Sequence, residues 1–119
     1  MRTTEVDFEG RLPVDGYGPG AFRVAGLVHC GPLALVPAGV VAWSGLPDLA
    51  PFLARAADFD VLLVGTGGTL ALPEGFGAAR GALEAAGPGL DVMATPSACR
   101  TYNVLLAEGR RVAAALMPV

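Results

Sequence analysis

A glycine-rich turn, Gly65-Thr66-Gly67-Gly68, directly follows the apolar run 61–64 and is the first place where this sequence could bind a ligand. Ligands of open α/β sheets bind beyond the carboxyl ends of the strands. Glycine lets a ligand approach the backbone closely, and free N–H groups at such a turn can hold an anion. The dinucleotide-binding fingerprint is incomplete, because Leu70 stands where its third glycine would fall. The turn is therefore either an anion-binding loop or a tight exit from a buried strand.

The start of the last predicted helix should lie beside this turn if strands 61–64 and 90–93 are neighbours in the sheet. A helix N-terminus combined with an arginine can hold an anion, because the backbone N–H groups and the guanidinium both attract negative charge. The alternative is ordinary helix capping beside a solvated arginine. The candidate ligand-binding residues are Gly65, Thr66, Gly67, Gly68, Thr95, Ser97 and Arg100.

Cys99 falls in the first turn of the same helix, where a thiolate would be stabilised, and it is the candidate reactive thiol. It also falls on the apolar stripe of that helix, and a buried cysteine behaves as an inert hydrophobic residue. His29 and Cys30 are adjacent in a predicted strand, so their side chains point to opposite faces and cannot hold one metal ion together. Because the cysteines also lack the spacing of a disulfide framework or a metal cluster, we expect no metal site.

The composition excludes several chemistries. All eight basic residues are arginine, which excludes Schiff-base chemistry, a phosphate-binding lysine loop and a lysine general base. His29 is the single histidine, so any histidine relay would have to use it. We predict no catalytic residues and no cofactor, and we favour a protein that is not an enzyme.

The net charge of −3 argues against a nucleic-acid partner, because binding to phosphates needs a basic surface. No apolar run approaches the roughly 20 residues that cross a bilayer, and the N-terminus carries no apolar signal core. We therefore expect a cytoplasmic protein with reduced thiols and no membrane span.

At 119 residues the chain is expected to form a single domain, with a β-meander over residues 1–45 and alternating helices and strands over residues 46–119. Segment 11–20 is rich in proline and glycine, so we predict a loop there. Tyr17 is either an anchor of this loop, which we favour, or a contact residue. The predicted strands are 4–8, 21–24, 27–30, 33–36, 40–43, 61–64, 90–93 and 112–117, and the predicted helices are 47–58, 74–86 and the segment that begins at Thr95.

The C-terminal segment has the clearest pattern. Thr95 is predicted to cap a helix that has Pro96 at its first position and Gly109 as a left-handed C-terminal cap. The run 112–117 that follows is apolar throughout, which is typical of a strand buried on both faces. Alternation of helices and strands here predicts a partly parallel sheet. The apolar stripe of the helix consists of Ala98, Cys99, Tyr102, Leu105 and Leu106.

Several pieces of this pattern together resemble one known family. The pieces are Gly16-Tyr17-Gly18-Pro19 with Phe22, segment 61–67, Thr95-Pro96, Ala98-Cys99, Thr101-Tyr102-Asn103, and Glu108-Gly109-Arg110 leading to segment 114–118. The chain resembles the family of small proteins of unknown function, domain-of-unknown-function family 498, that includes mitochondrial complex I assembly factor 3. The resemblance covers nearly the whole chain.

The resemblance implies an α/β fold in three layers, with a central mixed sheet flanked by helices and an added N-terminal antiparallel β-meander. It implies no catalytic residues. It also implies an assembly or interaction role, with subunits of a respiratory complex as candidate partners.

Two functions are therefore expected from different classes. The leading hypothesis is a non-enzymatic protein-interaction or assembly factor of a chaperone-like kind, which predicts an exposed apolar patch or a free sheet edge. The alternative is a binder of a small anionic ligand in the crevice between Gly65–Gly68 and Thr95–Arg100. A homo-oligomer built through the β layer is a third hypothesis.

Overall fold

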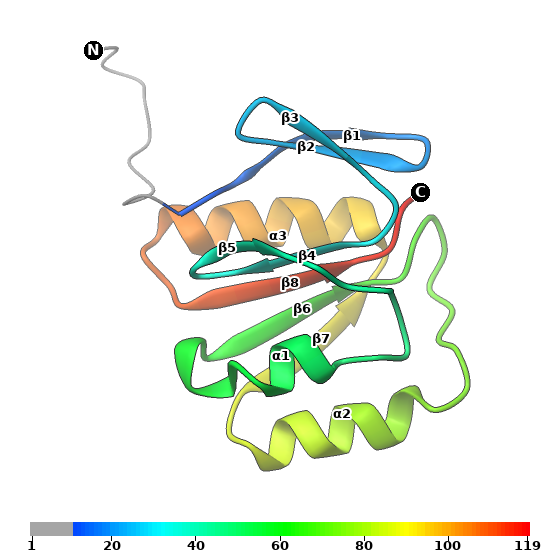
Figure 1. Cartoon of the computed structure of the whole chain (residues 1–119), viewed down its shortest axis with the longest axis vertical. Coiled ribbons are helices and arrows are strands. Elements are labelled where there is room, and N and C mark those ends of the chain that lie inside the picture. The colour runs from blue at the N-terminus through cyan, green and yellow to red at the C-terminus, as the bar shows by residue number, and fades with distance from the viewer. Residues whose placement is uncertain (1–10) are drawn as a thin grey trace.

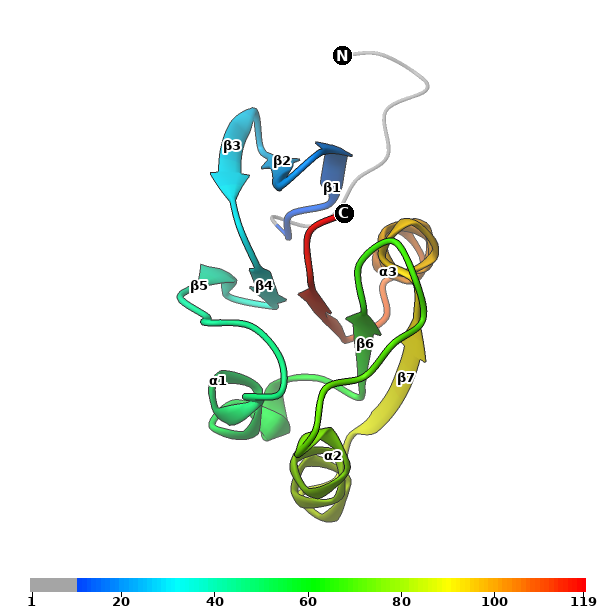
Figure 2. The same cartoon turned by 90° about the vertical axis from the view of Figure 1, so that its right-hand side faces the viewer.

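The computed structural model describes residues 11–119, so the predicted strand 4–8 lies outside the described residues. Two sheets stack in this part of the chain: a three-stranded antiparallel sheet and a five-stranded mixed sheet (Figure 1). Helices α1 and α2 cover one face of the five-stranded sheet, and α3 covers the other face, on the same side as the three-stranded sheet (Figure 2). The predicted three-layer α/β class is confirmed.

The three-stranded sheet consists of β1 (Val14–Gly18), β2 (Ala21–Val24) and β3 (Leu27–Cys30), in that order. Ala25 and Gly26 close the β2–β3 hairpin with φ values of 52° and 79°, as a tight primed turn requires. The predicted loop over 11–20 is wrong, because residues 14–18 pair with β2 as a strand. Cross-strand pairing with β2 overrides the local preference of a glycine-rich segment for a loop.

The five-stranded sheet has the order β5-β4-β8-β6-β7. Strand β6 is parallel to β7 and β8, and β4 is antiparallel to both β5 and β8. The last hairpin of the predicted meander thus belongs to the central sheet. The strand bounds are β4 (Leu33–Val36), β5 (Gly39–Val41), β6 (Val61–Gly65), β7 (Gly89–Met93) and β8 (Val112–Leu116), close to the predicted ranges.

The predicted helix 47–58 is wrong as a single element. The chain forms only α1 (Ala50–Leu53), one turn long, and then a 3₁₀ turn at Ala56–Asp58. Packing explains the break: Phe52 is buried, whereas the neighbouring Leu53 is 42% exposed. So short a helix lasts only where packing supports it. Helix α2 (Phe76–Ala85) begins two residues later than predicted, where Phe76 enters the core.

Helix α3 (Thr95–Ala107) has the predicted apolar stripe. Gly109 at φ 78° ends it, and the N–H groups of Gly109 and Arg110 donate to the carbonyl oxygens of Leu106 and Leu105. This is the pairing of a Schellman C-terminal cap. The predicted N-cap is wrong, because Ala94 occupies that position and Thr95 is already helical.

Strand β8 joins two cores. Val112, Ala114 and Leu116 face the core beneath α3 and the three-stranded sheet, and Ala113 and Ala115 face the core beneath α1 and α2. All five residues are buried, as predicted for a strand covered on both faces. Because β6 and β8 are parallel neighbours, the segments that follow them lie side by side at the carboxyl ends of these strands.

Candidate functional site

The predicted glycine turn and the start of α3 do lie together, and hydrogen bonds within the protein connect them. We call this contact between Gly67 and Thr95 the joint. The N–H of Gly67 donates to the Thr95 hydroxyl at 2.8 Å, and the N–H of Thr95 donates to the Gly67 carbonyl at 2.8 Å. The Thr95 hydroxyl in turn donates to the Met117 carbonyl at 2.7 Å. A Cβ atom on Gly65 would lie only 2.7 Å from the Thr95 hydroxyl oxygen, so glycine is needed there for close approach.

The other predicted ligand residues lie around this joint. Arg100 is exposed on α3, and its guanidinium donates to the Ser97 hydroxyl at 3.3 Å. Gly68 is exposed. The Gly67 N–H and the Thr95 hydroxyl are already used internally, so anion binding at this turn stays a prediction that depends on Arg100 and Ser97.

Thr66 lines a shallow hollow of about 320 Å³ at the carboxyl ends of β6 and β8. Its hydroxyl donates to the Thr69 carbonyl. The remaining lining residues are apolar: Leu46, Ala71, Leu72, Pro73 and Met117. This hollow occupies the usual ligand edge of an α/β sheet, but its lining is chemically unlike an anion site.

Cys99 is only 4% exposed and packs into the core beneath α3. Burial raises the pKa of its thiol to about 11, although the charge of Arg100 acts in the opposite direction. Such a thiol is protonated at neutral pH, which favours the inert over the reactive interpretation. Cys30 is exposed on β3, and no cluster of metal-ligating side chains occurs within residues 11–119.

The Thr101-Tyr102-Asn103 motif holds the N-terminal part of the described chain against α3. The Tyr102 hydroxyl donates to the Leu12 carbonyl at 2.9 Å. Asn103 makes two hydrogen bonds to the backbone of Val14, accepting from its N–H at 2.9 Å and donating to its carbonyl at 2.8 Å. These contacts give the motif a role in folding.

The larger hollow, about 400 Å³, lies against the three-stranded sheet, where the sequence predicted a loop. Gly16 lies opposite Arg23 on β2, and Arg23 lies opposite Val28 on β3. Gly18, Ala21 and Cys30 form a second cross-strand row on the same face. We call this outer face, with Asp15 at its rim, the β1–β3 groove. Tyr17, predicted as a loop anchor, lines the hollow and is 43% exposed.

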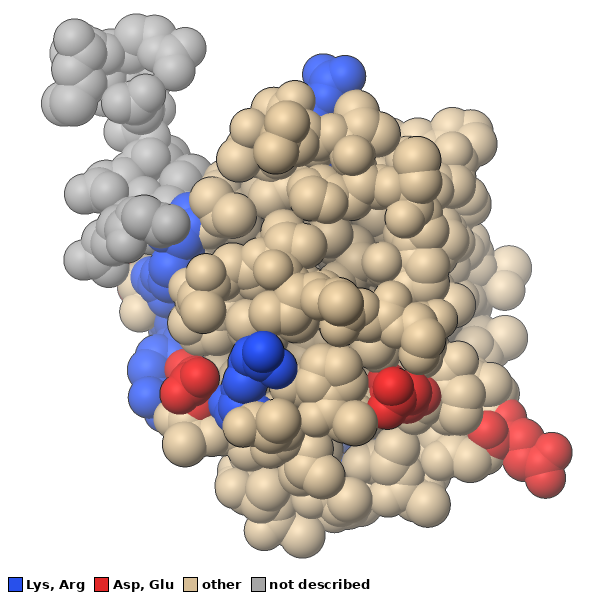
Figure 3. Space-filling view, viewed as in Figure 1, with Lys and Arg blue, Asp and Glu red and all other residues tan. Residues whose placement is uncertain are grey.

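Strand β3 borders the groove and forms one edge of its sheet. Two large apolar side chains are exposed on it, Leu27 at 66% and Val28 at 60%. Edge strand β5 of the central sheet lies on the same side of the molecule (Figure 2) and exposes Val40. The part of this face around β3 and β5 is almost free of charged side chains, whereas acidic and basic groups lie lower on the same face (Figure 3). The predicted exposed apolar edge is therefore present.

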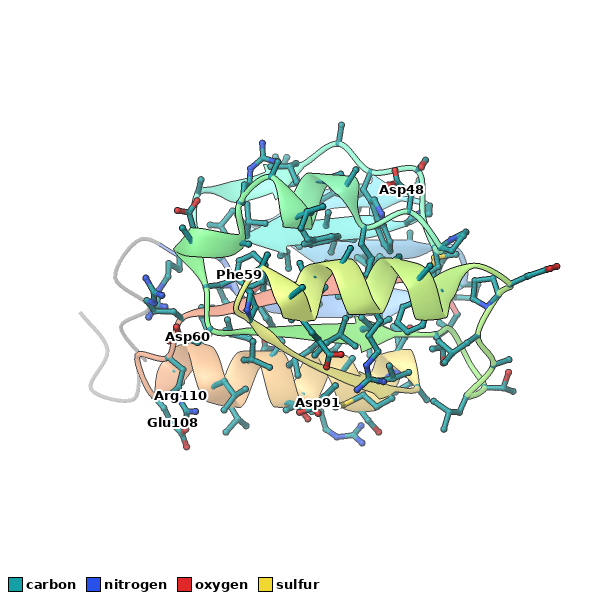
Figure 4. The ribbon with its side chains drawn as sticks, turned by 90° about the horizontal axis from the view of Figure 1, so that it is seen from below. Asp48, Phe59, Asp60, Asp91, Glu108 and Arg110 are labelled. Atoms are coloured by element: carbon teal, nitrogen blue, oxygen red, sulfur yellow. The ribbon has the colours of Figure 1, made fainter. Side chains whose placement is uncertain are left out.

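Charged residues gather instead at the end where β6 and β8 begin. Figure 4 shows Asp60, Glu108 and Arg110 at that end. Arg111 bonds Asp60 at 2.8 Å, and Arg110 approaches Glu108 at 4.0 Å. The hydrogen bond from Arg111 holds the pKa of Asp60 below its ordinary value. These pairs are exposed, so each contributes little to stability.

A five-stranded mixed sheet with a three-stranded sheet above α3 defines a known domain class. A solution structure from Bordetella pertussis, described as a Mth938-like domain, matches with a TM-score of 0.77 at 30% identity over 99% of this chain and 92% of that chain. A crystal structure described as an outer membrane protein from Bartonella henselae matches with a TM-score of 0.80 at 40% identity, over 95% and 99% of the two chains.

The chain belongs to the family "Protein of unknown function (DUF498/DUF598)", whose profile matches residues 14–117. It is 49% identical over 120 residues to an uncharacterized protein of Rhodobacter capsulatus, covering 100% of this chain and 94% of that protein. It is 33% identical over 115 residues to the zebrafish (Danio rerio) NADH dehydrogenase [ubiquinone] 1 alpha subcomplex assembly factor 3. That match covers 86% of this chain but only 62% of the assembly factor. The resemblance expected from the sequence is confirmed.

None of the helices in residues 11–119 combines the length and the apolar character needed to cross a bilayer.

Proposed function

We propose that this protein is a non-enzymatic interaction factor, of the assembly or chaperone-like kind, that binds another protein chain along β3. The observation that carries the proposal is the exposure of Leu27 and Val28 on an edge strand. A free apolar strand edge is a template for aggregation, and proteins usually blunt it with charge, proline or a covering element. Here neither charge nor proline occurs within Leu27–Cys30, so a binding partner is the expected cover.

The hydrogen-bond pattern of the hairpin favours strand addition as the binding mode. Val24 and Leu27 flank the turn and form its closing pair. Because bonded and non-bonded pairs alternate along an antiparallel ladder, the N–H and C=O of Val28 point away from β2. An extended partner segment can pair with this edge, as in β-augmentation, while Leu27 and Val28 add apolar contact.

The similarity to complex I assembly factor 3 supports the assembly role and suggests subunits of a respiratory complex as partners. The chain spans 62% of that factor, so the activity of the whole factor enters here only as part of the proposal. We further propose a cytoplasmic location. The free thiols of Cys30 and Cys99 agree with a reducing compartment.

The proposal is tested by chemical crosslinking and affinity capture in the organism that encodes the chain. Three tagged forms are compared: wild type, Leu27→Asp and the control Val104→Asp. Val104 is a matched control because it is also an exposed apolar residue, at 56%, but lies on α3, on the side of the molecule away from β3 (Figure 2). Both changes place one carboxylate on the surface.

We expect wild type and Val104→Asp to capture the same partner, with crosslinks that map to β2–β3, and Leu27→Asp to lose it. Blue-native gels of a deletion strain then show whether a respiratory complex fails to assemble. Sedimentation of the purified protein separates this result from self-association, since a homo-oligomer through β3 would also dissociate in Leu27→Asp. Capture that is equal in all three forms would contradict the proposal.

A further inference from the structure

The β1–β3 groove has two glycines on its floor, and the first of them follows a shift in the register between β1 and β2. Gly16 and Gly18 both lie within β1, and neither adopts the left-handed φ that would demand glycine. A Cβ atom added at either position meets no other atom within 4 Å. Glycine inside a strand weakens it, because glycine loses more backbone entropy on folding than other residues and has no side chain to pack. Residues 11–119 therefore contain no contact that explains these two glycines.

Glycine in a strand also marks places where another backbone or a ligand approaches closely. Gly65 illustrates this within the chain, since Thr95 fills the space that its side chain would take. At Gly16 and Gly18 the corresponding space is the open hollow. No residue that the structure describes fills this space.

Arg23 supplies the chemistry of the groove. Every other arginine in residues 11–119 makes a hydrogen bond or an ion pair with a neighbouring group. Arg23 is exposed and makes neither with any residue that the structure describes. Its cross-strand neighbours are Gly16 and Val28, so Arg23 lies in the sheet between a residue without a side chain and an apolar residue.

We propose that the β1–β3 groove holds an extended, acidic segment of a protein partner, with its backbone over Gly16 and Gly18 and a carboxylate on Arg23. A guanidinium binds a carboxylate through two parallel N–H···O bonds, which fixes the position of the segment. Asp15 lines the same hollow, and its carboxylate accepts the Gly26 N–H at 3.3 Å. The negative charge of Asp15 repels an acidic side chain of the bound segment at its end of the groove, whereas Arg23 attracts one. The carboxylate bound at Arg23 therefore sets the direction of the segment. The inference rests on the proposed function and assigns its recognition chemistry.

The test uses a phage-displayed library of random peptides selected on the full-length wild-type protein. Selected peptides are then titrated against Gly16→Val and Arg23→Gln. The control for the glycine is Gly77→Val, because a Cβ atom at Gly77 also meets nothing within 4 Å. The control for the arginine is Arg110→Gln, because the guanidinium of Arg110 is exposed and its distance to Glu108 is as long as 4.0 Å. The thermal midpoint of each variant is measured alongside.

We expect selected peptides to be enriched in Asp and Glu, and the affinity to fall about tenfold or more for Arg23→Gln, as loss of a charged hydrogen bond predicts. Gly16→Val should abolish binding and leave the thermal midpoint at or above that of wild type, since valine suits a strand better than glycine. The controls should bind as wild type does.

Several results would overturn the inference: no enriched peptide, peptides without acidic residues, or equal binding by Gly16→Val. A lowered thermal midpoint for Gly16→Val would show that Gly16 is needed for folding, and this result would also contradict the inference. Peptides that bind wild type and Gly16→Val alike but lose affinity for Leu27→Asp would overturn the groove and leave the β3 proposal standing. Acetate or succinate that shifts the Arg23 amide signal, without any enriched peptide, would make the groove a small-anion site and refute docking of a protein segment.

Discussion

The hydroxyl of Thr95 accepts a hydrogen bond from the backbone N–H of Gly67 at 2.8 Å, in a place with no solvent exposure. The same hydroxyl donates to the carbonyl of Met117 at 2.7 Å. One side chain thus connects the segment after β6, the start of α3 and the segment after β8. In the turn that the sequence suggested as an anion-binding loop, the N–H of Gly67 is therefore already used by Thr95.

Replacing Thr95 by valine keeps the shape of the side chain and removes the hydroxyl. The buried N–H of Gly67 and the partly buried carbonyl of Met117 then lose their partner. We expect the free energy of unfolding to fall by about 2–4 kcal/mol, because each unsatisfied buried group costs about 1–3 kcal/mol. Urea denaturation measures it. Thr95→Ser, which keeps the hydroxyl and loses one methyl group, should cost only about 1 kcal/mol; an equal cost for the two variants would contradict this account.

Gly65→Ala tests the close approach at the same joint. Its Cβ would lie 2.7 Å from the Thr95 hydroxyl oxygen and 3.0 Å from the Thr95 Cα, so part of the helix backbone would have to move. Overpacking of this kind costs about 1–3 kcal/mol. Gly68→Ala is the control, because its Cβ meets nothing within 4 Å and should change stability by less than about 0.5 kcal/mol. Similar denaturation midpoints for the two variants would show that the joint tolerates a side chain.

Asn103→Ala tests the attachment of β1 to α3. The variant loses both hydrogen bonds to the backbone of Val14, and we expect a loss of about 1–3 kcal/mol. Amide signals of β1 should shift in an ¹⁵N correlation spectrum, while those of β6 stay in place. Val104→Ala, at the exposed neighbouring position, serves as the control. Unchanged β1 signals in Asn103→Ala would remove this motif from the folding account.

Stability should fall at alkaline pH because of two buried groups. Burial raises the pKa of Cys99 to about 11 and that of Tyr102 to about 12, from 9.0 and 10.0. The folded protein therefore holds these protons more tightly than the unfolded chain, and the free energy of unfolding declines as the pH rises above 9 and through 11. For Cys99 the decline should be roughly 1–3 kcal/mol. Cys99→Ala should show a flatter profile between pH 9 and 11 in urea titrations at stepped pH.

Thiol labelling gives the control for that profile. At pH 8 a thiol reagent should modify exposed Cys30 quickly and buried Cys99 only after unfolding, so native Cys30→Ser should react very slowly. Labelling of Cys99 in the native protein at the rate of an exposed thiol would instead identify it as the reactive thiol that its place in the first turn of a helix suggested.

Long apolar patterns made the central layer predictable from sequence. The run 112–117 is apolar throughout, and only a strand covered on both faces satisfies it, as β8 does. The spacing of Ala98, Tyr102 and Leu106 likewise predicted the buried stripe of α3. In each case the signal is local and strong enough to survive the tertiary context.

The groove could not be predicted, because pairing and not local preference makes β1 a strand. Gly16 and Gly18 suggest a loop until β2 provides hydrogen-bonding partners. The role of Thr95 was misjudged for a related reason. A threonine before proline at a helix start looks like a cap, and only the distant segments at Gly67 and Met117 reveal what its hydroxyl bonds. Contacts between residues far apart in sequence leave no local pattern.

Hydrogen–deuterium exchange on the protein with and without its captured partner tests the central claim most directly. If a partner strand adds to β3, the amide of Val28, which points away from β2, should exchange freely in the isolated protein and become protected in the complex. Amides at the exposed face of α3 around Val104 should exchange at the same rate in both states. Protection confined to α3, with the exchange of Val28 unchanged by the partner, would contradict the account.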